Sequence, residues 1–276
     1  MTPEIIAHLL ALMTGEGPAA LDLERLATAS PAAMTAGGGE RRAGTVAVIP
    51  VTGLLVPRSL STWFGTIGGQ DGLRRTISAA ARNPDVSAIV LDVDSPGGIV
   101  AGTAETAETV RAAAASKPVV AVANPLAASA AYWIAAQASE VVAVPGADVG
   151  SIGIVVAHQN VSRLQERMGV ETTLIRAGKY KAEANPFEPL GEEARAAIQE
   201  RVDAAYAAFV DDVARGRKTT AKAVREGFGE GRVVEARRAL SLGMVDRVAT
   251  LDAVVAALAA NRRRPRTPRR SAIAFA

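Results

Sequence analysis

Residues 87–98 read SAIVLDVDSPGG, and this stretch decides the fold class. The first seven residues, Ser87–Val93, are almost continuously apolar, which is typical of a strand buried on both faces of a parallel sheet. Two glycines close the following segment, 94–98, and let backbone N–H groups face a ligand that no side chain obstructs. Such amides can form an oxyanion hole, although an ordinary strand-to-helix turn would have the same residues.

Similar apolar strands alternate with helix-periodic segments along the rest of the chain. Strands are expected at 45–55, at 118–123, near 141, and at 152–157, 171–175 and 245–248; helices are expected at 70–81, 104–115, 129–138, 161–168, 192–215, 219–226, 234–242 and 251–260. This alternation predicts an α/β fold, a mostly parallel sheet with flanking helices, whose functional groups gather at strand ends and helix N-termini.

Composition removes several classes of chemistry. The chain of 276 residues is 49% hydrophobic, which is enough for a sizeable core. It contains no cysteine, so disulfides, thiolate metal sites and cysteine nucleophiles are excluded. His8 and His158 are the two histidines. A multi-histidine metal centre cannot be built from two histidines, and we expect no metal site.

The two ends of the chain are expected to lie outside one folded domain at 45–260. Residues 1–44 should hold an amphipathic helix and a flexible Gly/Ala-rich linker, and 261–276 a disordered tail. Six arginines lie in that tail, so subtracting them from the net charge of +3 leaves −3 for the rest. The tail could touch nucleic acid or an acidic protein, but we expect it to be solvated, and we do not predict a nucleic-acid-binding protein.

No export or membrane segment is expected. Glu4 stands where a signal peptide has positive charge, and the apolar stretch 5–13 is short and interrupted by His8. The weakly polar run 118–136 divides into a strand and a helix. We therefore expect a cytoplasmic protein.

A serine in residues 124–135, NPLAASAAYWIA, is the candidate nucleophile. A strand is expected to end at Asn124 and a helix of small residues to begin at or beside Ser129. Its hydroxyl would then lie at a helix N-terminus, where negative charge is favoured. The Ala130 N–H would be placed to contact the oxyanion formed when the hydroxyl attacks a carbonyl. Taken alone, Ser129 could be an ordinary N-cap.

Two lysines occur in residues 178–187, GKYKAEANPF. A lysine can act as a general base only where its surroundings lower its pKa from about 10.4 toward neutrality, which costs roughly 4 kcal/mol for a shift of about 3 units. The residues alone do not separate such a base from solvated charges at Lys179 and Lys181.

A second serine lies between glycines in residues 149–154, VGSIGI. Ser151 could orient a buried amine, or it could simply lie at a strand edge. His158 follows on the same expected strand and is also weighed as a catalytic base.

Together and in this order, the four segments resemble the signal peptide peptidase A and bacteriophage protein C-type serine peptidases, which have a ClpP/crotonase-like fold. The resemblance extends over roughly residues 45–250 and implies roles for particular residues. It makes Ser129 the nucleophile, Lys181 rather than Lys179 the base, Ser151 the residue that orients the lysine, and Gly97, Gly98 and Ala130 the sources of oxyanion amides. It leaves no such role for His158. Many relatives have glycines where Ala130 and Ala131 stand, but alanine keeps the N–H.

The residues around His158 and after Lys181 are closer to phage head-maturation proteases than to membrane-bound signal peptide peptidases. The resemblance therefore implies a serine endopeptidase with a Ser129–Lys181 dyad and no cofactor. It would cleave itself or the scaffold or portal-associated proteins of a procapsid, in the bacterial cytoplasm or the procapsid, as a homo-oligomer. The alternatives are a cytoplasmic protease of general peptide turnover, a crotonase-type hydratase or isomerase, and an inert capsid-assembly subunit. The crotonase alternative would need a carboxylate in the oxyanion loops, and none is suitably placed in the sequence.

Overall fold

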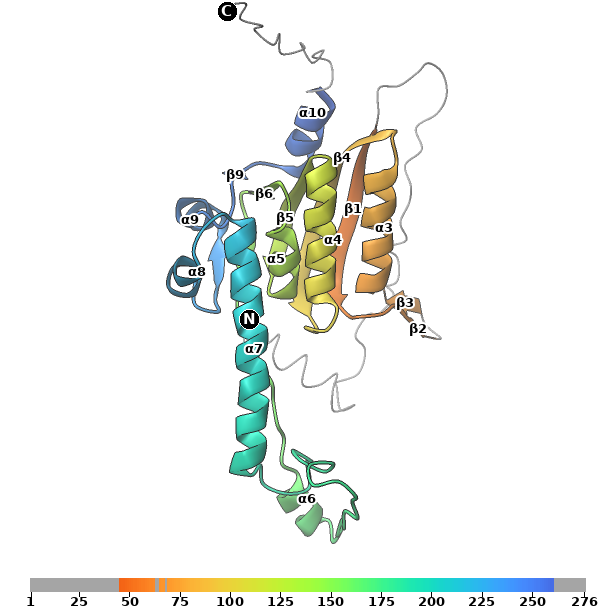
Figure 1. Cartoon of the computed structure of the whole chain (residues 1–276), viewed down its shortest axis with the longest axis vertical. Helices are drawn as coiled ribbons and strands as arrows, with labels where there is room; N and C mark the ends of the chain where they lie inside the picture. Colours follow the sequence, from red (N-terminus) through yellow and green to blue (C-terminus); the bar gives the residue numbers. More distant parts are fainter. Residues whose placement is uncertain (1–44, 63–64, 68, 261–276) are drawn as a thin grey trace, which may run out of the picture.

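A mostly parallel sheet forms the body of the molecule (Figure 1). The computed structural model describes residues 45–62, 65–67 and 69–260, so the expected N-terminal helix, linker and Arg-rich tail lie outside the described residues. Parallel neighbours in the sheet are, in order, β1 (Thr45–Leu55), β4 (Val86–Gly98), β5 (Val119–Ala128), β6 (Glu140–Ala143) and β9 (Arg247–Val248). The predicted α/β class with a mostly parallel sheet is confirmed.

Shorter strands extend this sheet and form a separate ribbon. β7 (Asp148–Gly150) pairs in parallel with the second half of β5, and β8 (Val233–Glu235) pairs with β7 in antiparallel fashion. β2 (Leu60–Thr62) and β3 (Gly65–Ile67) form a separate antiparallel pair.

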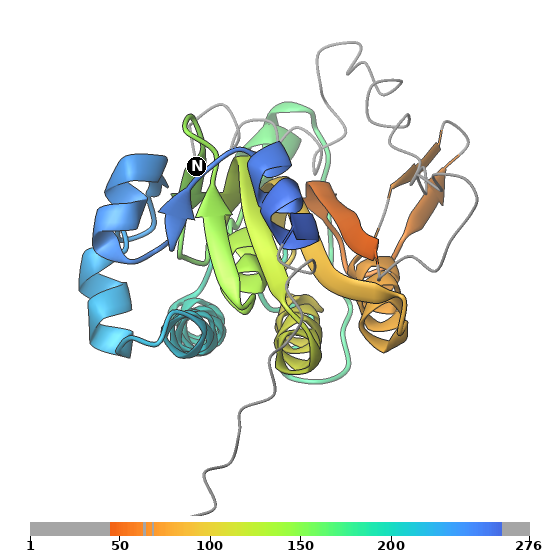
Figure 2. The ribbon, with the colours of Figure 1, turned by 90° about the horizontal axis from the view of Figure 1, so that it is seen from above.

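Helices lie on both faces of the sheet (Figure 2). One face carries α3 (Gln70–Arg82), α4 (Thr103–Ser116), α5 (Ala130–Ala135) and α7 (Glu192–Gly216), and the other carries α10 (Leu251–Ala260). At the β8 and β9 side lie α8 (Ala221–Gly227) and α9 (Ala236–Leu242). No helix within the described ranges is both long and apolar enough to cross a bilayer.

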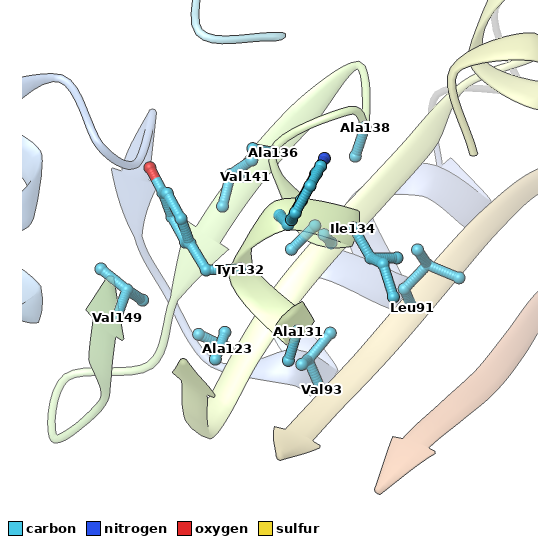
Figure 3. Close-up of a cluster of buried hydrophobic side chains, with 14 of the residues drawn as sticks. Leu91, Val93, Ala123, Ala131, Tyr132, Ile134, Ala136, Ala138, Val141 and Val149 are labelled. Carbon is cyan, nitrogen blue, oxygen red and sulfur yellow. The ribbon is translucent and has the colours of Figure 1, made fainter. Parts of the chain in front are cut away.

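Alternate residues of β4 face two separate hydrophobic cores, as expected for a strand covered on both sides. Ile89 and Leu91 belong to the larger core under α3, α4 and α5, whereas Val90 packs with Val254 of α10 in the smaller one. Figure 3 shows the larger core, in which Ile134 of α5 points toward Leu91. The sheet thus places α5 against the centre of the domain.

An extension leaves the body between β7 and α7 (Figure 1). It holds α6 (Ser162–Arg167) at its far end, beside the beginning of the long helix α7. The strands predicted at 152–157 and 171–175 are wrong, because neither segment pairs with a neighbouring strand. An isolated strand leaves its backbone groups unpaired, so an apolar run without a partner forms no sheet.

Several element boundaries also differ from the prediction. β4 and β5 were expected to end at Val93 and Asn124, but they continue to Gly98 and Ala128. Pairing of Ser95 with Ala127, and of 126–128 with β7, supplies the backbone partners that carry both strands onward. The helix expected over 129–138 is limited to α5.

Candidate active site

Ser129 occupies a sharp turn between β5 and α5. Its backbone has φ 53° and ψ −124°, and its N–H donates a 2.7 Å hydrogen bond to the Gly150 carbonyl. A positive φ is uncommon for a residue with a side chain, and such conformations cluster at functional sites. The half-buried Ser129 side chain makes no capping hydrogen bond, so the N-cap interpretation does not describe its hydroxyl. The predicted place at a helix N-terminus is confirmed.

Gly97 packs directly against this turn. It has φ 96°, and a Cβ on it would lie 2.8 Å from each of three atoms: Ala128 O, Ala130 N and Ser129 Cβ. Real Cβ atoms do not approach backbone this closely, so the position requires glycine. The end of β4 and the start of α5 therefore meet at Ser129, as the sequence predicted.

Backbone amides converge on the same place. Ala130 is the first residue of α5, and within the described part of the chain its N–H forms no backbone hydrogen bond. The Gly97 N–H already donates to Ser95 Oγ at 3.1 Å. Of the two glycines, Gly98 is therefore the better candidate to donate to an oxyanion alongside Ala130.

Ser151 lies one residue beyond the carbonyl that binds Ser129. It too has a positive φ, of 52°, and its N–H donates to Arg232 O at 2.9 Å. Ser151 is 8% exposed, and its hydroxyl makes no hydrogen bond to any residue that the structure describes. Buried polar side chains normally have a partner, so this hydroxyl is available to an additional group.

Two residues that the sequence analysis missed anchor α5 to α7. Trp133 Nε1 donates a 2.7 Å hydrogen bond to Asp212 Oδ2, and the Trp133 ring stacks on Phe209 with centroids 4.6 Å apart. A tryptophan four residues after Ser129 was visible in the sequence. Its partner could not be found there, because Asp212 is 79 residues away.

Lys181 lies in the extension and not beside Ser129. It belongs to the turn region between α6 and α7, which Figure 1 places at the far end of the extension, whereas α5 lies in the body. Lys181 is exposed, and it takes part in no ion pair within the described ranges. A single copy of the chain therefore brings together Gly97, Ser129, Ala130 and Ser151 but not the predicted lysine.

Lys179 has different surroundings from Lys181. Its Nζ donates to Tyr180 Oη at 2.7 Å and to Glu193 Oε1 at 2.9 Å, while the Tyr180 hydroxyl also donates to Glu193. Its hydrogen bonds with Tyr180 and then with Glu193 raise the pKa of Lys179. This direction is the opposite of what a general base requires.

His158 contacts the loop that carries Lys181. Its Nε2 lies 3.1 Å from the Asn185 carbonyl oxygen. A carbonyl can only accept, so Nε2 carries the proton in this contact and is not free to act as a base. Within the described residues, no group of three or more histidine, aspartate or glutamate side chains is placed to hold a metal ion.

The sequence model of Peptidase family S49 matches residues 111–263, more than half of the chain and including both Ser129 and Lys181. The chain belongs to peptidase family S49. The resemblance stated from the four segments is thereby confirmed. This S49 chain is 34% identical over 202 residues to capsid assembly protease C of Escherichia phage lambda, covering 73% of this chain and 46% of that protein. It is 33% identical over 215 residues to the head-tail preconnector protein GP5 of Enterobacteria phage P21, covering 78% of this chain and 42% of that protein.

The S49 chain spans less than half the length of either phage protein. A solved structure of a serine-to-alanine mutant of the membrane-bound stomatin-specific protease 1510-N is similar in fold, with a TM-score of 0.52 and 16% identity. That match covers 78% of this chain and 84% of the other. At this identity the likeness concerns the fold alone.

Proposed function

We propose that the chain is a serine endopeptidase in which Ser129 is the nucleophile and Lys181 the general base. The geometry of Ser129 carries this proposal. Ser129 has a positive φ at the N-terminus of α5, and its hydroxyl makes no capping hydrogen bond. It packs against Gly97, where any side chain would clash with the turn. This arrangement suits a nucleophile whose attack creates negative charge beside backbone amides.

In the proposed reaction, uncharged Lys181 Nζ removes the Ser129 proton while Ser129 Oγ forms a bond to the substrate carbonyl carbon. The carbonyl oxygen becomes an oxyanion and accepts hydrogen bonds from the N–H groups of Ala130 and Gly98, with Gly97 shaping the turn. The C–N bond then breaks, and the lysine ammonium gives its proton to the departing amine. Water hydrolyses the acyl-enzyme, which releases the acid and restores the Ser129 hydroxyl.

A second copy of the chain supplies Lys181 in this proposal, because the lysine of the same copy lies on the extension away from α5. The extension exposes many large apolar side chains: Val155, Val156, Leu164, Met168, Val170, Leu174, Ile175 and Tyr180. Such a concentration of exposed apolar side chains is typical of an interaction surface. The Ser151 hydroxyl would then bind and orient the incoming amine. The functional form is accordingly a homo-oligomer.

An open hollow of about 440 Å³, whose wall begins at Ile152 directly after Ser151, is the proposed place for a substrate side chain. Its walls include Ile152 and Ile154, which follow Ser151 directly, and Tyr206 of α7. Ile152 is only two residues from the carbonyl that binds Ser129, a span of at most about 7 Å. A side chain near the scissile bond could therefore enter it.

The proposed substrates are polypeptides of a phage or prophage procapsid, including scaffold or portal-associated proteins and the chain itself. This rests on the likeness to capsid assembly protease C and GP5, each of which is more than twice as long as the matched part. The proposed place of action is the bacterial cytoplasm or the procapsid. No nucleic acid and no cofactor takes part.

A fluorophosphonate probe tests the nucleophile directly. We expect the full-length protein to be labelled on Ser129, as identified by mass spectrometry of the modified peptide, and Ser129→Ala to remain unlabelled. Ser241 is exposed and its hydroxyl only donates to the Arg238 carbonyl, so Ser241→Ala is a matched control that should label normally. Labelling at another serine, or none with a protein that cleaves peptides, would contradict the proposal.

A further inference from the structure

The loop that carries Lys181 has no regular secondary structure, but it is closed by its own hydrogen bonds. The Lys181 N–H donates to Gly178 O at 3.2 Å, with Gly178 at φ 95°. Further along, Ala184 has φ 55°. A loop with such backbone conformations keeps one shape only where contacts determine it.

Asn185 closes the far side of this loop with both ends of its side-chain amide. Its Nδ2 donates to Ala182 O at 2.8 Å, and its Oδ1 accepts from the Phe187 N–H at 2.9 Å. The backbone immediately after Lys181 is therefore tied to Asn185.

His158 ties this closed loop to the segment that enters the extension from the body. Its imidazole Nε2 donates to Asn185 O at 3.1 Å, across 27 residues of sequence. Three residues later, the Val161 N–H donates to Pro186 O at 2.7 Å. The carbonyls of Asn185 and Pro186 are thus both bound by the segment 158–161. His158 provides the one of these two hydrogen bonds that comes from a side chain.

We propose that His158 is a positioning residue for Lys181, acting through Asn185. The inference rests on the proposed peptidase function and concerns how its base is held. In this arrangement Lys181 reaches the other copy from a protruding loop, so the loop backbone determines the position of its amine. Misplacement of a reacting group by about 1 Å can cost about 100-fold in rate. By holding the Asn185 carbonyl, His158 limits that displacement without touching the substrate.

The test compares three variants of the full-length protein. His158→Leu removes the donor, whereas His158→Gln keeps an N–H at nearly the position of Nε2. Gln159→Ala is the matched control, because Gln159 is the exposed neighbour and its side chain makes no hydrogen bond within the described part of the chain. The readouts are kcat and KM for a peptide substrate, and amide hydrogen exchange of the peptide covering 178–187.

We expect His158→Leu to lower kcat about 10- to 100-fold while KM changes less than about twofold, and to speed exchange in residues 178–187. His158→Gln should restore kcat to within about threefold of the original protein and slow the exchange again. Gln159→Ala should match the original protein in both readouts.

A double variant separates positioning from a general structural role. If His158 acts through Lys181, His158→Leu should have no further effect on the residual rate of Lys181→Ala. An unchanged kcat in His158→Leu, or an equal loss in both backgrounds, would overturn the inference. Full activity in Lys181→Ala would instead overturn the peptidase proposal and this inference with it, while hydrogen exchange would still show whether His158 holds the loop.

Discussion

The N–H of Ser129 donates a 2.7 Å hydrogen bond to the carbonyl of Gly150, and this bond holds the start of α5 against the loop that carries Ser151. Ser129 and Ser151 both have positive φ, a conformation that costs about 1–3 kcal/mol for each residue. Packing against Gly97 and pairing of Ser151 with Arg232 determine these conformations. The energy of folding is thereby used to hold the two serine residues in adjacent turns of the backbone.

Gly97→Ala should abolish catalysis while most of the fold survives. The added methyl would lie 2.8 Å from the Ala130 nitrogen and the Ser129 Cβ, so the turn must move. We expect a fall in kcat/KM of at least about 100-fold for the displaced nucleophile. Gly146→Ala is the control, since a Cβ there meets nothing within 4 Å. Equal peptide cleavage by the two variants would show that the close packing at Gly97 is not needed.

The two lysines of the loop should respond differently to removal. Lys179→Ala breaks an ion pair whose side chains are 67% and 64% exposed, and solvent and salt screen such a pair, so its loss should matter little. Its cleavage rate should stay within about threefold of the original, whereas Lys181→Ala should lose about 100-fold or more. Steady-state cleavage of a peptide by both variants is the measurement. A larger loss in Lys179→Ala would reassign the base.

Trp133→Phe should weaken the attachment of α5 to α7. The ring can still stack on Phe209, but the hydrogen bond to Asp212 is lost. We expect the free energy of unfolding to fall by about 1–2 kcal/mol, measured by urea denaturation. Asp212→Asn keeps an acceptor oxygen and should cost less. A loss of stability in Asp212→Asn that exceeds the loss in Trp133→Phe would locate the effect in the Arg215 ion pair of Asp212 instead.

Asp246 should make stability depend on pH in acid. Burial alone would raise the pKa of Asp246, but hydrogen bonds from Arg217 and the Val141 N–H, with the charge of Arg217, hold that pKa below its usual value. A carboxyl with a lowered pKa in the folded state stabilises it above the unfolded pKa of about 4, and this contribution is lost as pH falls below that value.

Asp246→Asn therefore tests this pair by denaturation at several pH values. At neutral pH the variant should be less stable by roughly 1–2 kcal/mol, because Arg217 is buried while Asp246 is partly exposed. The difference between the two proteins should shrink as pH falls below about 4. If the difference in the free energy of unfolding between the two proteins stays constant across this pH range, the charge of Asp246 does not contribute to stability.

Much of the body could be predicted because its signals are local. The apolar run 87–93 predicted a strand covered on both faces, and the small residues of 124–135 predicted a helix that starts at or beside Ser129; β4 and α5 confirm both elements. Gly97 was predicted to supply an oxyanion amide; the structure places it against Ser129, with its own N–H donating to Ser95 Oγ.

The extension could not be predicted, because its structure depends on partners that a local pattern does not contain. The run 171–175 has the composition of a strand, but no neighbouring backbone pairs with it. The continuation of β5 beyond Asn124 likewise depends on β7, which lies about twenty residues further along the chain. Sequence spacing did not show that Lys181 would lie on the extension, because the spacing of residues does not determine in which direction a segment leaves the body.

Mixed oligomers of Ser129→Ala and Lys181→Ala chains test most directly whether the dyad forms between copies. The two variants, co-expressed with different tags and purified through both, should each be inactive alone. With random assembly, the fraction of all sites that combine an intact serine with a partner's intact lysine is about a quarter in a large ring and about a half in a doubly purified dimer, and cleavage should return to about that fraction of the original rate. Purified mixed oligomers with no cleavage, from subunits that are active when neither is mutated, would contradict a site shared between copies.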